Sequence, residues 1–66
     1  MKEKIGNDAG CVWNILNEGG AKPVKELKKL TKMTDKEIYA AIGWLAREEK
    51  LVFDPRETDL YLSLVR

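Results

Sequence analysis

The stretch "TDKEIYAAIGWLAREEKL", residues 34–51, decides the fold, because it combines a helix start signal with a helical row of apolar residues. Thr34 is followed three residues later by Glu37, which is the spacing of a capping box. The apolar residues that recur at helical spacing are Ile38, Ala41, Ile42 and Leu45. We therefore predict a helix that begins after Thr34, buries this row and ends near Lys50.

Two helices are predicted before residue 34. The first carries the apolar row Ile5, Ala9, Val12 and Leu16, and it should end at the Gly19-Gly20 pair, which supplies left-handed backbone. Residues 21–23 can then form a short extended stretch.

The second helix is short and basic and runs from Val24 to about Lys32. Its predicted inner side holds Val24, Leu27 and Leu30, and its outer side holds Lys25, Lys28, Lys29 and Lys32.

Two apolar runs after residue 50 predict a hairpin joined by "PRETD". Leu51 and Phe53 in the first run, and alternate leucines in the second, predict one buried face. Val52, Tyr61 and Val65 make the other face apolar as well, which indicates that a partner covers part of it.

Length and composition predict one small domain over residues 1–66. A domain of this length buries only about 60% of the surface that its unfolded chain exposes. The chain has one cysteine and no histidine, so intramolecular disulfides and histidine-based metal sites are excluded as sources of extra stability, and self-association remains. A lone thiol and an N-terminal segment without an apolar core favour the cytoplasm, and no stretch is apolar enough to cross a membrane.

The order of elements over residues 5–65 resembles the winged helix-turn-helix family, and "VKELKKLTKMTDKEIYAAIGWLAREEKLVF" carries the resemblance. The fold class is therefore expected to be α+β: three helices, a C-terminal hairpin wing and a possible short strand before the second helix. Within it, "AAIGWLAREEKL" is similar to a small group of stand-alone bacterial winged-helix proteins of unassigned function. That resemblance implies a homodimer.

Winged helices of this family bind DNA, RNA or proteins, so the resemblance leaves the ligand open. For double-stranded DNA, the third helix would enter the major groove and the lysines of the second would neutralise phosphates. The candidate DNA contacts are Lys25, Lys28, Lys29, Lys32, Thr34, Lys36, Tyr39, Ala40, Gly43, Arg47 and Arg56.

The distribution of charge supports this hypothesis in one half of the chain and opposes it in the other. Residues 1–33 carry seven lysines and four acids, net +3, whereas residues 34–66 carry five basic and seven acidic residues, net −2. In the wing, Asp54, Glu57 and Asp59 outnumber Arg56, and Asp35 adds a carboxylate near the expected phosphates. The alternative interpretation of the lysines is a solvated helix face, on a domain that serves protein interaction or dimerisation without DNA.

The pair Gly43-Trp44 indicates a contact surface, because a glycine within a helix costs about 1 kcal/mol relative to alanine and exposed tryptophan is enriched at interfaces. Trp44 either joins an interface, packs on the hairpin of its own chain or meets nucleic acid. A symmetric dimer would bury the leftover apolar residues about a two-fold axis. The candidate interface residues are Trp13, Ile15, Trp44, Val52, Tyr61 and Val65.

Catalysis is not expected. The chain offers no histidine, metal-ligand cluster or glycine-rich phosphate loop, and Cys11 projects away from the core row of the first helix. We expect no enzyme activity, metal or cofactor.

Overall fold

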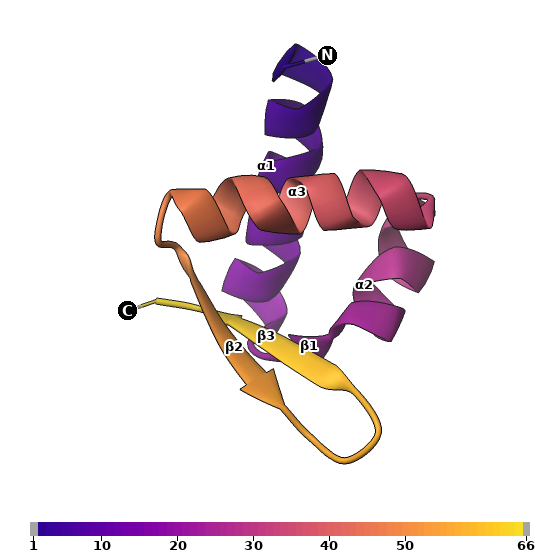
Figure 1. Cartoon of the computed structure of the whole chain (residues 1–66), viewed down its shortest axis with the longest axis vertical. Helices are drawn as coiled ribbons and strands as arrows, with labels where there is room; N and C mark the ends of the chain where they lie inside the picture. The colour runs from indigo at the N-terminus through magenta and orange to yellow at the C-terminus, as the bar shows by residue number, and fades with distance from the viewer. Residues whose placement is uncertain (1, 66) are drawn as a thin grey trace.

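The computed structural model describes residues 2–65 and has the predicted order of elements (Figure 1). The helices are α1 (Lys2–Gly19), α2 (Val24–Thr31) and α3 (Asp35–Arg47), and the strands are β1 (Lys22–Pro23), β2 (Leu51–Pro55) and β3 (Leu60–Leu64). The fold is α+β, and the short strand predicted before the second helix is present.

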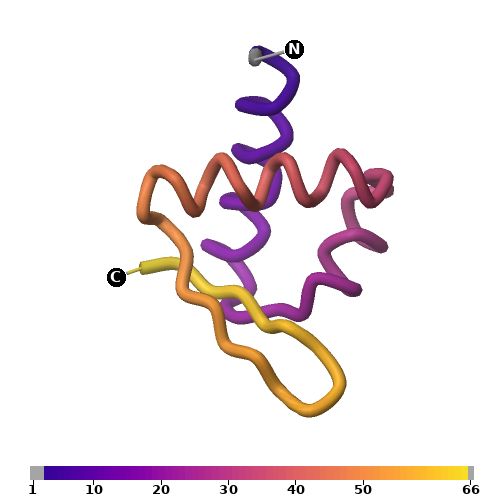
Figure 2. Tube along the Cα trace, viewed as in Figure 1, coloured from indigo at the N-terminus to yellow at the C-terminus, as the bar shows by residue number. Residues whose placement is uncertain are grey.

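The three strands form an antiparallel sheet in the order β1-β3-β2. In β2 and β3, Leu51 lies opposite Leu64 and Phe53 opposite Leu62, while β1 places Lys22 opposite Leu62. The loop between β2 and β3 projects beyond the helices, as the chain trace shows (Figure 2). This projecting hairpin is the wing.

One cluster of buried apolar residues joins the helices to the sheet. Helix α3 lies across α1 (Figure 1), its inner row packs mainly against α1, and α1 and α2 in turn contact β3. The buried residues are Ala9, Val12, Leu16, Leu27, Ile38, Ala41, Ile42, Leu45, Leu51, Leu62 and Leu64. The rows predicted for α3 and for residues 9–16 of α1 are confirmed. Full burial of each leucine or isoleucine stabilises the fold by about 1.5–3 kcal/mol.

Two residues predicted to be buried are exposed. Leu30 is 55% exposed, because α2 has only eight residues and its last turn extends past the core. Phe53 is 45% exposed although it shares a sheet face with the buried Leu51, because β2 is the outermost strand and extends past the helices toward the wing.

Left-handed residues end all three helices. Gly20 has φ 78° after α1, as the glycine pair predicts, but Lys32 (φ 59°) follows α2 and Glu49 (φ 57°) follows α3. After α3, the N–H of Lys50 donates to the carbonyl of Leu45 and the N–H of Glu49 to that of Ala46, which is a Schellman motif. Helix α3 therefore ends at Arg47 rather than near Lys50.

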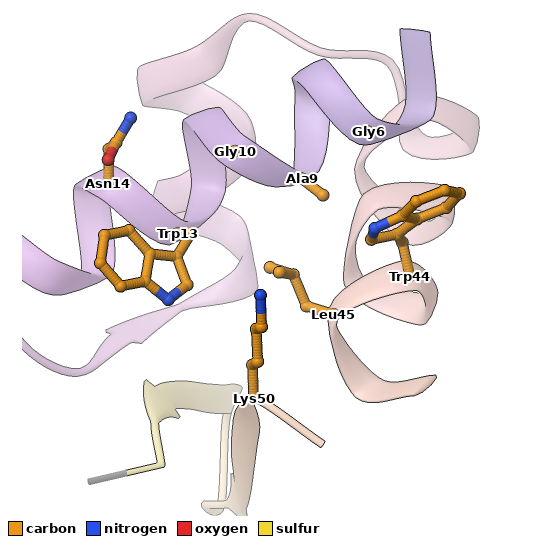
Figure 3. Close-up of a pocket in the computed structure, with 8 residues that line it drawn as sticks. All are labelled: Gly6, Ala9, Gly10, Trp13, Asn14, Trp44, Leu45 and Lys50. Atoms are coloured by element: carbon orange, nitrogen blue, oxygen red, sulfur yellow. The ribbon is translucent and has the colours of Figure 1, made fainter. Parts of the chain in front are cut away.

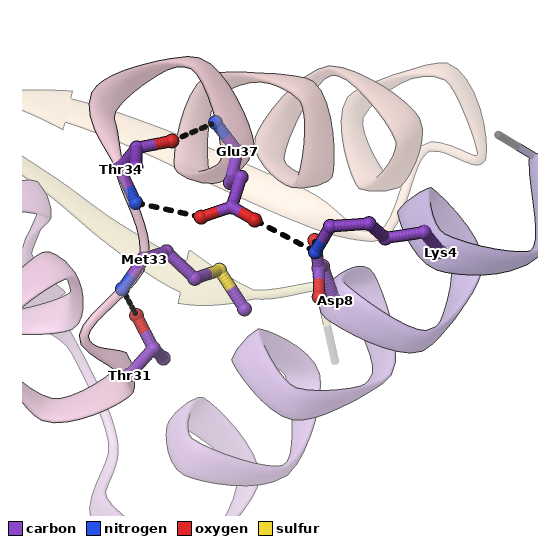
Figure 4. A network of polar contacts seen from close by, with 6 residues as sticks. All are labelled: Lys4, Asp8, Thr31, Met33, Thr34 and Glu37. Atoms are coloured by element: carbon purple, nitrogen blue, oxygen red, sulfur yellow. Dashed lines mark hydrogen bonds and ion pairs between the residues drawn. The ribbon is translucent and has the colours of Figure 1, made fainter.

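The predicted capping box at the start of α3 is confirmed (Figure 4). The Thr34 hydroxyl accepts from the N–H of Glu37 (3.2 Å), and the Glu37 carboxylate accepts from the N–H of Thr34 (2.9 Å). The other carboxylate oxygen of Glu37 lies 2.8 Å from the ammonium of Lys4, which also binds Asp8 at 2.9 Å. These contacts tie the first turn of α3 to α1.

The hydrogen bond from Lys4, followed by those from Thr34, lowers the pKa of Glu37 to about 2. The hydrogen bonds to Glu37 and then to Asp8 raise the pKa of Lys4 to about 12. At neutral pH both groups are therefore charged, and the contact between α1 and α3 is an ion pair.

Replacing Thr34 by alanine removes one half of the capping box, and we expect the free energy of unfolding to fall by about 1 kcal/mol. Urea denaturation followed by circular dichroism measures the change. Thr58→Ala, at an exposed position in the wing loop, is the control and should change stability by less than about 0.5 kcal/mol. Equal losses in both variants would contradict a stabilising role for the cap.

The lowered pKa of Glu37 predicts an acid-dependent loss of stability. Because the folded pKa lies below the ordinary value of 4.5, the contribution is complete above that pH and disappears as the pH falls through about 2. Glu37→Gln should therefore reduce the slope of stability against pH in this interval, measured by urea denaturation at several pH values. Glu57→Gln in the wing is the control, and a slope unchanged in Glu37→Gln would refute the assignment.

Candidate nucleic-acid interface

The outer side of α3 presents a ridge formed by Lys36, Tyr39, Gly43 and Arg47, all of which are exposed. Tyr39 is 59% exposed. A Cβ built on Gly43 would meet no atom within 4 Å, so the glycine leaves open space rather than accommodating a neighbour within the chain. The ridge therefore offers two cations, one aromatic ring and one position where another molecule can approach the backbone closely.

Ala40 and Thr34 do not belong to this ridge. The helical wheel places Ala40 on the outer side, but α1 crosses α3 here and half-buries it beside Ile5. The hydroxyl of Thr34 accepts a hydrogen bond within the capping box.

All four candidate lysines of α2 are exposed, and Leu27 on the opposite side is buried. Lys28 forms an ion pair with Asp35 at the start of α3. The other three lysines have no such partner: within residues 2–65, no carboxylate lies within 4.0 Å of their ammonium groups. The same holds for the two cations of the α3 ridge. These five free cations are Lys25, Lys29, Lys32, Lys36 and Arg47.

In the wing, Arg56 is held by its own hairpin. Its guanidinium binds Asp54 at 3.1 Å and lies 3.9 Å from the centre of the Tyr61 ring. The wing is otherwise acidic through Glu57 and Asp59. Its single cation is thus largely compensated, and the wing presents net negative charge.

A cleft of about 420 Å³ separates the wing from α2 and the start of α3. Lys25 and Lys28 line it together with Asp35 and Asp59, and Tyr39 and Thr58 complete its polar rim. The cleft is therefore of mixed charge, and the free cations lie mainly along α2 and the outside of α3.

A second hollow, of about 270 Å³, lies between α1 and the end of α3 (Figure 3). Trp13 and Trp44 stand on either side of it, with Lys50 between them. A Cβ on Gly6 would lie 3.9 Å from the indole of Trp44, so Trp44 lies against α1 of its own chain.

The remaining candidate dimer residues differ in exposure. Trp13 and Ile15 are half-buried against the core of their own chain. Tyr61 is half-buried beneath Arg56, whereas Val52 and Val65 are exposed on the outer side of the hairpin. Val52 and Val65 of the hairpin are therefore more accessible to a second subunit than Trp13 and Ile15 of α1.

Sequence reasoning missed two features of the surface. The first is the pairing of Lys28 with Asp35, which the approach of two successive helices across a tight turn produces. The second is the exposure of Leu30 and Phe53. The short length of α2 was the only available signal for Leu30, and strand order was needed for Phe53.

Within residues 2–65, the structure contains no group of three or more histidine, cysteine, aspartate or glutamate side chains that could hold a metal ion. Cys11 is exposed on α1 and belongs to no such group. In the described part of the chain, no helix combines the length and the apolar character needed to span a bilayer.

Three helices, a tight turn between α2 and α3 and a β-hairpin wing define a winged helix-turn-helix protein. Residues 1–64 match the family described as "Winged helix-turn-helix domain (DUF2582)", and the chain belongs to this family.

The chain is similar to two further proteins. The uncharacterized protein MJ1608 of Methanocaldococcus jannaschii is 39% identical in the matched segment, which covers 77% of this chain and 76% of that protein. The solution NMR structure of protein BT2368 from Bacteroides thetaiotaomicron has a TM-score of 0.84 and 32% identity, and it covers 96% of this chain and 77% of that one.

Proposed function

We propose that residues 1–66 act as one winged-helix domain that binds double-stranded DNA as a homodimer, serving as a small transcriptional regulator in the cytoplasm. The observation that carries the proposal is the set of five free cations along α2 and the α3 ridge, on the two helices that face DNA in this class of fold. Phosphate neutralisation by lysine and arginine supplies most of the affinity of such domains.

The two helices have different parts in the proposed complex. Helix α2 crosses the DNA backbone, and Lys25, Lys29 and Lys32 neutralise phosphates. The α3 ridge enters the major groove, where Lys36 and Arg47 bind phosphate or guanine and Gly43 lets the helix approach closely. The ridge carries no asparagine or glutamine to read adenine, so we expect weak sequence discrimination.

The acidic wing stays away from the phosphates in this arrangement. Arg56 is retained by Asp54 and Tyr61, and the neighbouring carboxylates repel the DNA backbone. The proposed contact is thus limited to α2 and α3.

A protein-interaction module is the second candidate function. Leu30 and Tyr39 favour it, because both are more than half exposed on the helices that would otherwise meet DNA, and apolar or aromatic side chains of this kind form interface centres. Titration with duplex DNA, followed by backbone amide shifts at low salt, separates the two. Shifts confined to α2 and α3 support DNA binding, and the absence of shifts supports the protein module.

Replacing both Lys25 and Lys29 by alanine should weaken DNA binding and lower the slope of log affinity against log salt by about 2, because two phosphate contacts are lost. Fluorescence anisotropy with a labelled duplex, from about 50 to about 200 mM salt, measures both quantities. Lys22→Ala is the matched control, since its ammonium already pairs with Glu26 at 3.2 Å. The same slope in all three proteins would refute the proposed contact.

Asp35→Asn should have the opposite effect. It removes a carboxylate at the start of α3 and frees Lys28 for a phosphate, so affinity should rise and the salt slope should increase by about 1. Glu18→Gln, near the end of α1, removes the same charge outside the cleft and serves as control. Unchanged binding by Asp35→Asn would show that Lys28 lies outside the DNA contact.

A further inference from the structure

Strand β2 forms an open edge of the sheet, since β3 is its only neighbour among the described residues. The N–H of Val65 donates to the carbonyl of Lys50 (2.9 Å), and the N–H of Arg56 donates to that of Asp59 (2.8 Å). Hydrogen-bonded pairs alternate along an antiparallel ladder, so Val52 and Asp54 also direct their backbone groups toward β3. The N–H and C=O groups of Leu51 and Phe53 therefore point to the open edge.

This edge has apolar side chains on both faces. Val52 is 46% exposed on the outer face, and Phe53 is 45% exposed on the helix-facing side. Natural proteins usually protect an open edge with lysine, proline or a bulge, whereas proline appears here only at the end of the strand, at Pro55. The first three residues of β2 thus form an apolar segment with unpaired backbone groups on one side.

We propose that a second copy of this chain pairs with this edge, β2 against β2 in antiparallel orientation, with Val52 opposite Val52 on the two-fold axis. The inference rests on the homodimer of the proposed function and specifies its interface. Each copy's Leu51 then lies opposite the second copy's Phe53, and the four N–H and C=O groups that face the edge in each copy form hydrogen bonds. The two three-stranded sheets become one continuous sheet.

Charge complementarity favours this register. With Val52 on the axis, Lys50 lies opposite the second copy's Asp54. Within residues 2–65, the ammonium of Lys50 has no carboxylate within 4.0 Å, and its side chain lies between Trp13 and Trp44 (Figure 3). Among the described residues, Asp54 pairs only with Arg56, on the same exposed hairpin. To pair with the second copy's carboxylate, the exposed Lys50 side chain has to turn from the hollow to the outer face of the sheet, where Asp54 lies.

The two neighbouring registers are worse. Centring on Phe53 sets Leu51 opposite Pro55, which has no N–H to donate, and Lys50 opposite Arg56, which has the same charge. Centring on Leu51 sets Phe53 opposite Glu49, whose left-handed backbone (φ 57°) belongs to the turn after α3 and cannot continue a strand pair. Pairing about Val52 avoids both conflicts.

The proposed interface leaves the α2 part of the DNA surface free. Helix α2 lies on the opposite side of the molecule from the start of β2 (Figure 1), so the lysines of α2 remain available in the dimer.

Disulfide cross-linking tests the register directly. In a Cys11→Ser background, Val52→Cys should form a covalent dimer under mild oxidation, because directly opposed residues in a non-hydrogen-bonded pair have Cβ atoms about 4.5 Å apart. Asp54→Cys is the matched control, because it lies on the same face of the sheet. In the proposed register the two cysteines at position 54 are offset by four residues along the strand, about 13 Å, which a disulfide cannot bridge. Non-reducing electrophoresis measures both.

Charge exchange gives a second, independent readout. Lys50→Asp alone should weaken the dimer about tenfold or more in sedimentation equilibrium, and the double variant Lys50→Asp/Asp54→Lys should restore it. Asp59→Lys in the wing loop makes the same charge change as Asp54→Lys and should not rescue Lys50→Asp. Circular dichroism confirms that each variant is folded.

The outcomes separate this inference from the proposed function. A dimer in which the Val52→Cys variant does not cross-link, or the Asp54→Cys variant cross-links instead, overturns the β2 interface while the homodimer and DNA binding stand. A monomer at all concentrations overturns the interface and the homodimer, and DNA binding is then decided by the titration alone. Cross-linking at position 52 together with rescue by charge exchange supports the inference even if no DNA binds.

Discussion

The packing of α3 across α1, within a core that α1 also shares with β3, is the constraint on which the rest of this structure depends. Ile38, Ala41, Ile42 and Leu45 are all buried and belong to the core. Because these residues occupy one side of α3, the opposite side must face outward. The position of the outer ridge, and with it the candidate DNA surface, is therefore a direct consequence of how the core is filled.

The polar contacts fix the same arrangement at its edges. Lys4 links α1 to the capping box of α3 through Glu37, and Lys28 links α2 to α3 through Asp35. Each pair is exposed, so its individual contribution to stability is small. Their effect is on orientation and charge: the first sets where α3 begins relative to α1, and the second removes one cation from the basic surface of α2. The local charge available for a ligand is thus set by helix packing as well as by composition.

Much of the fold could be predicted from the sequence because its signals are local. The capping box at Thr34, the row from Ile38 to Leu45 and the glycines after α1 each act within one turn of helix. Long-range geometry was less accessible. The wheel placed Ala40 on the outside, since it contains no information on how α1 crosses α3, and alternation placed Phe53 inside, since it contains no information on strand order. For the candidate site, the types of residue were predictable, but the pairing of Lys28 and the retention of Arg56 by Tyr61 were not.

Two of the three helix ends use residues that are not glycine in left-handed backbone, Lys32 after α2 and Glu49 after α3. Such a residue costs about 1 kcal/mol relative to a glycine in the same conformation. Glycine at either of these two exposed positions would therefore raise the stability of the fold. Lys32 is also a proposed phosphate contact, so a glycine there would exchange binding for stability. A glycine at Glu49 would instead offset destabilising changes on the α3 ridge and so let a new binding specificity evolve without loss of the fold.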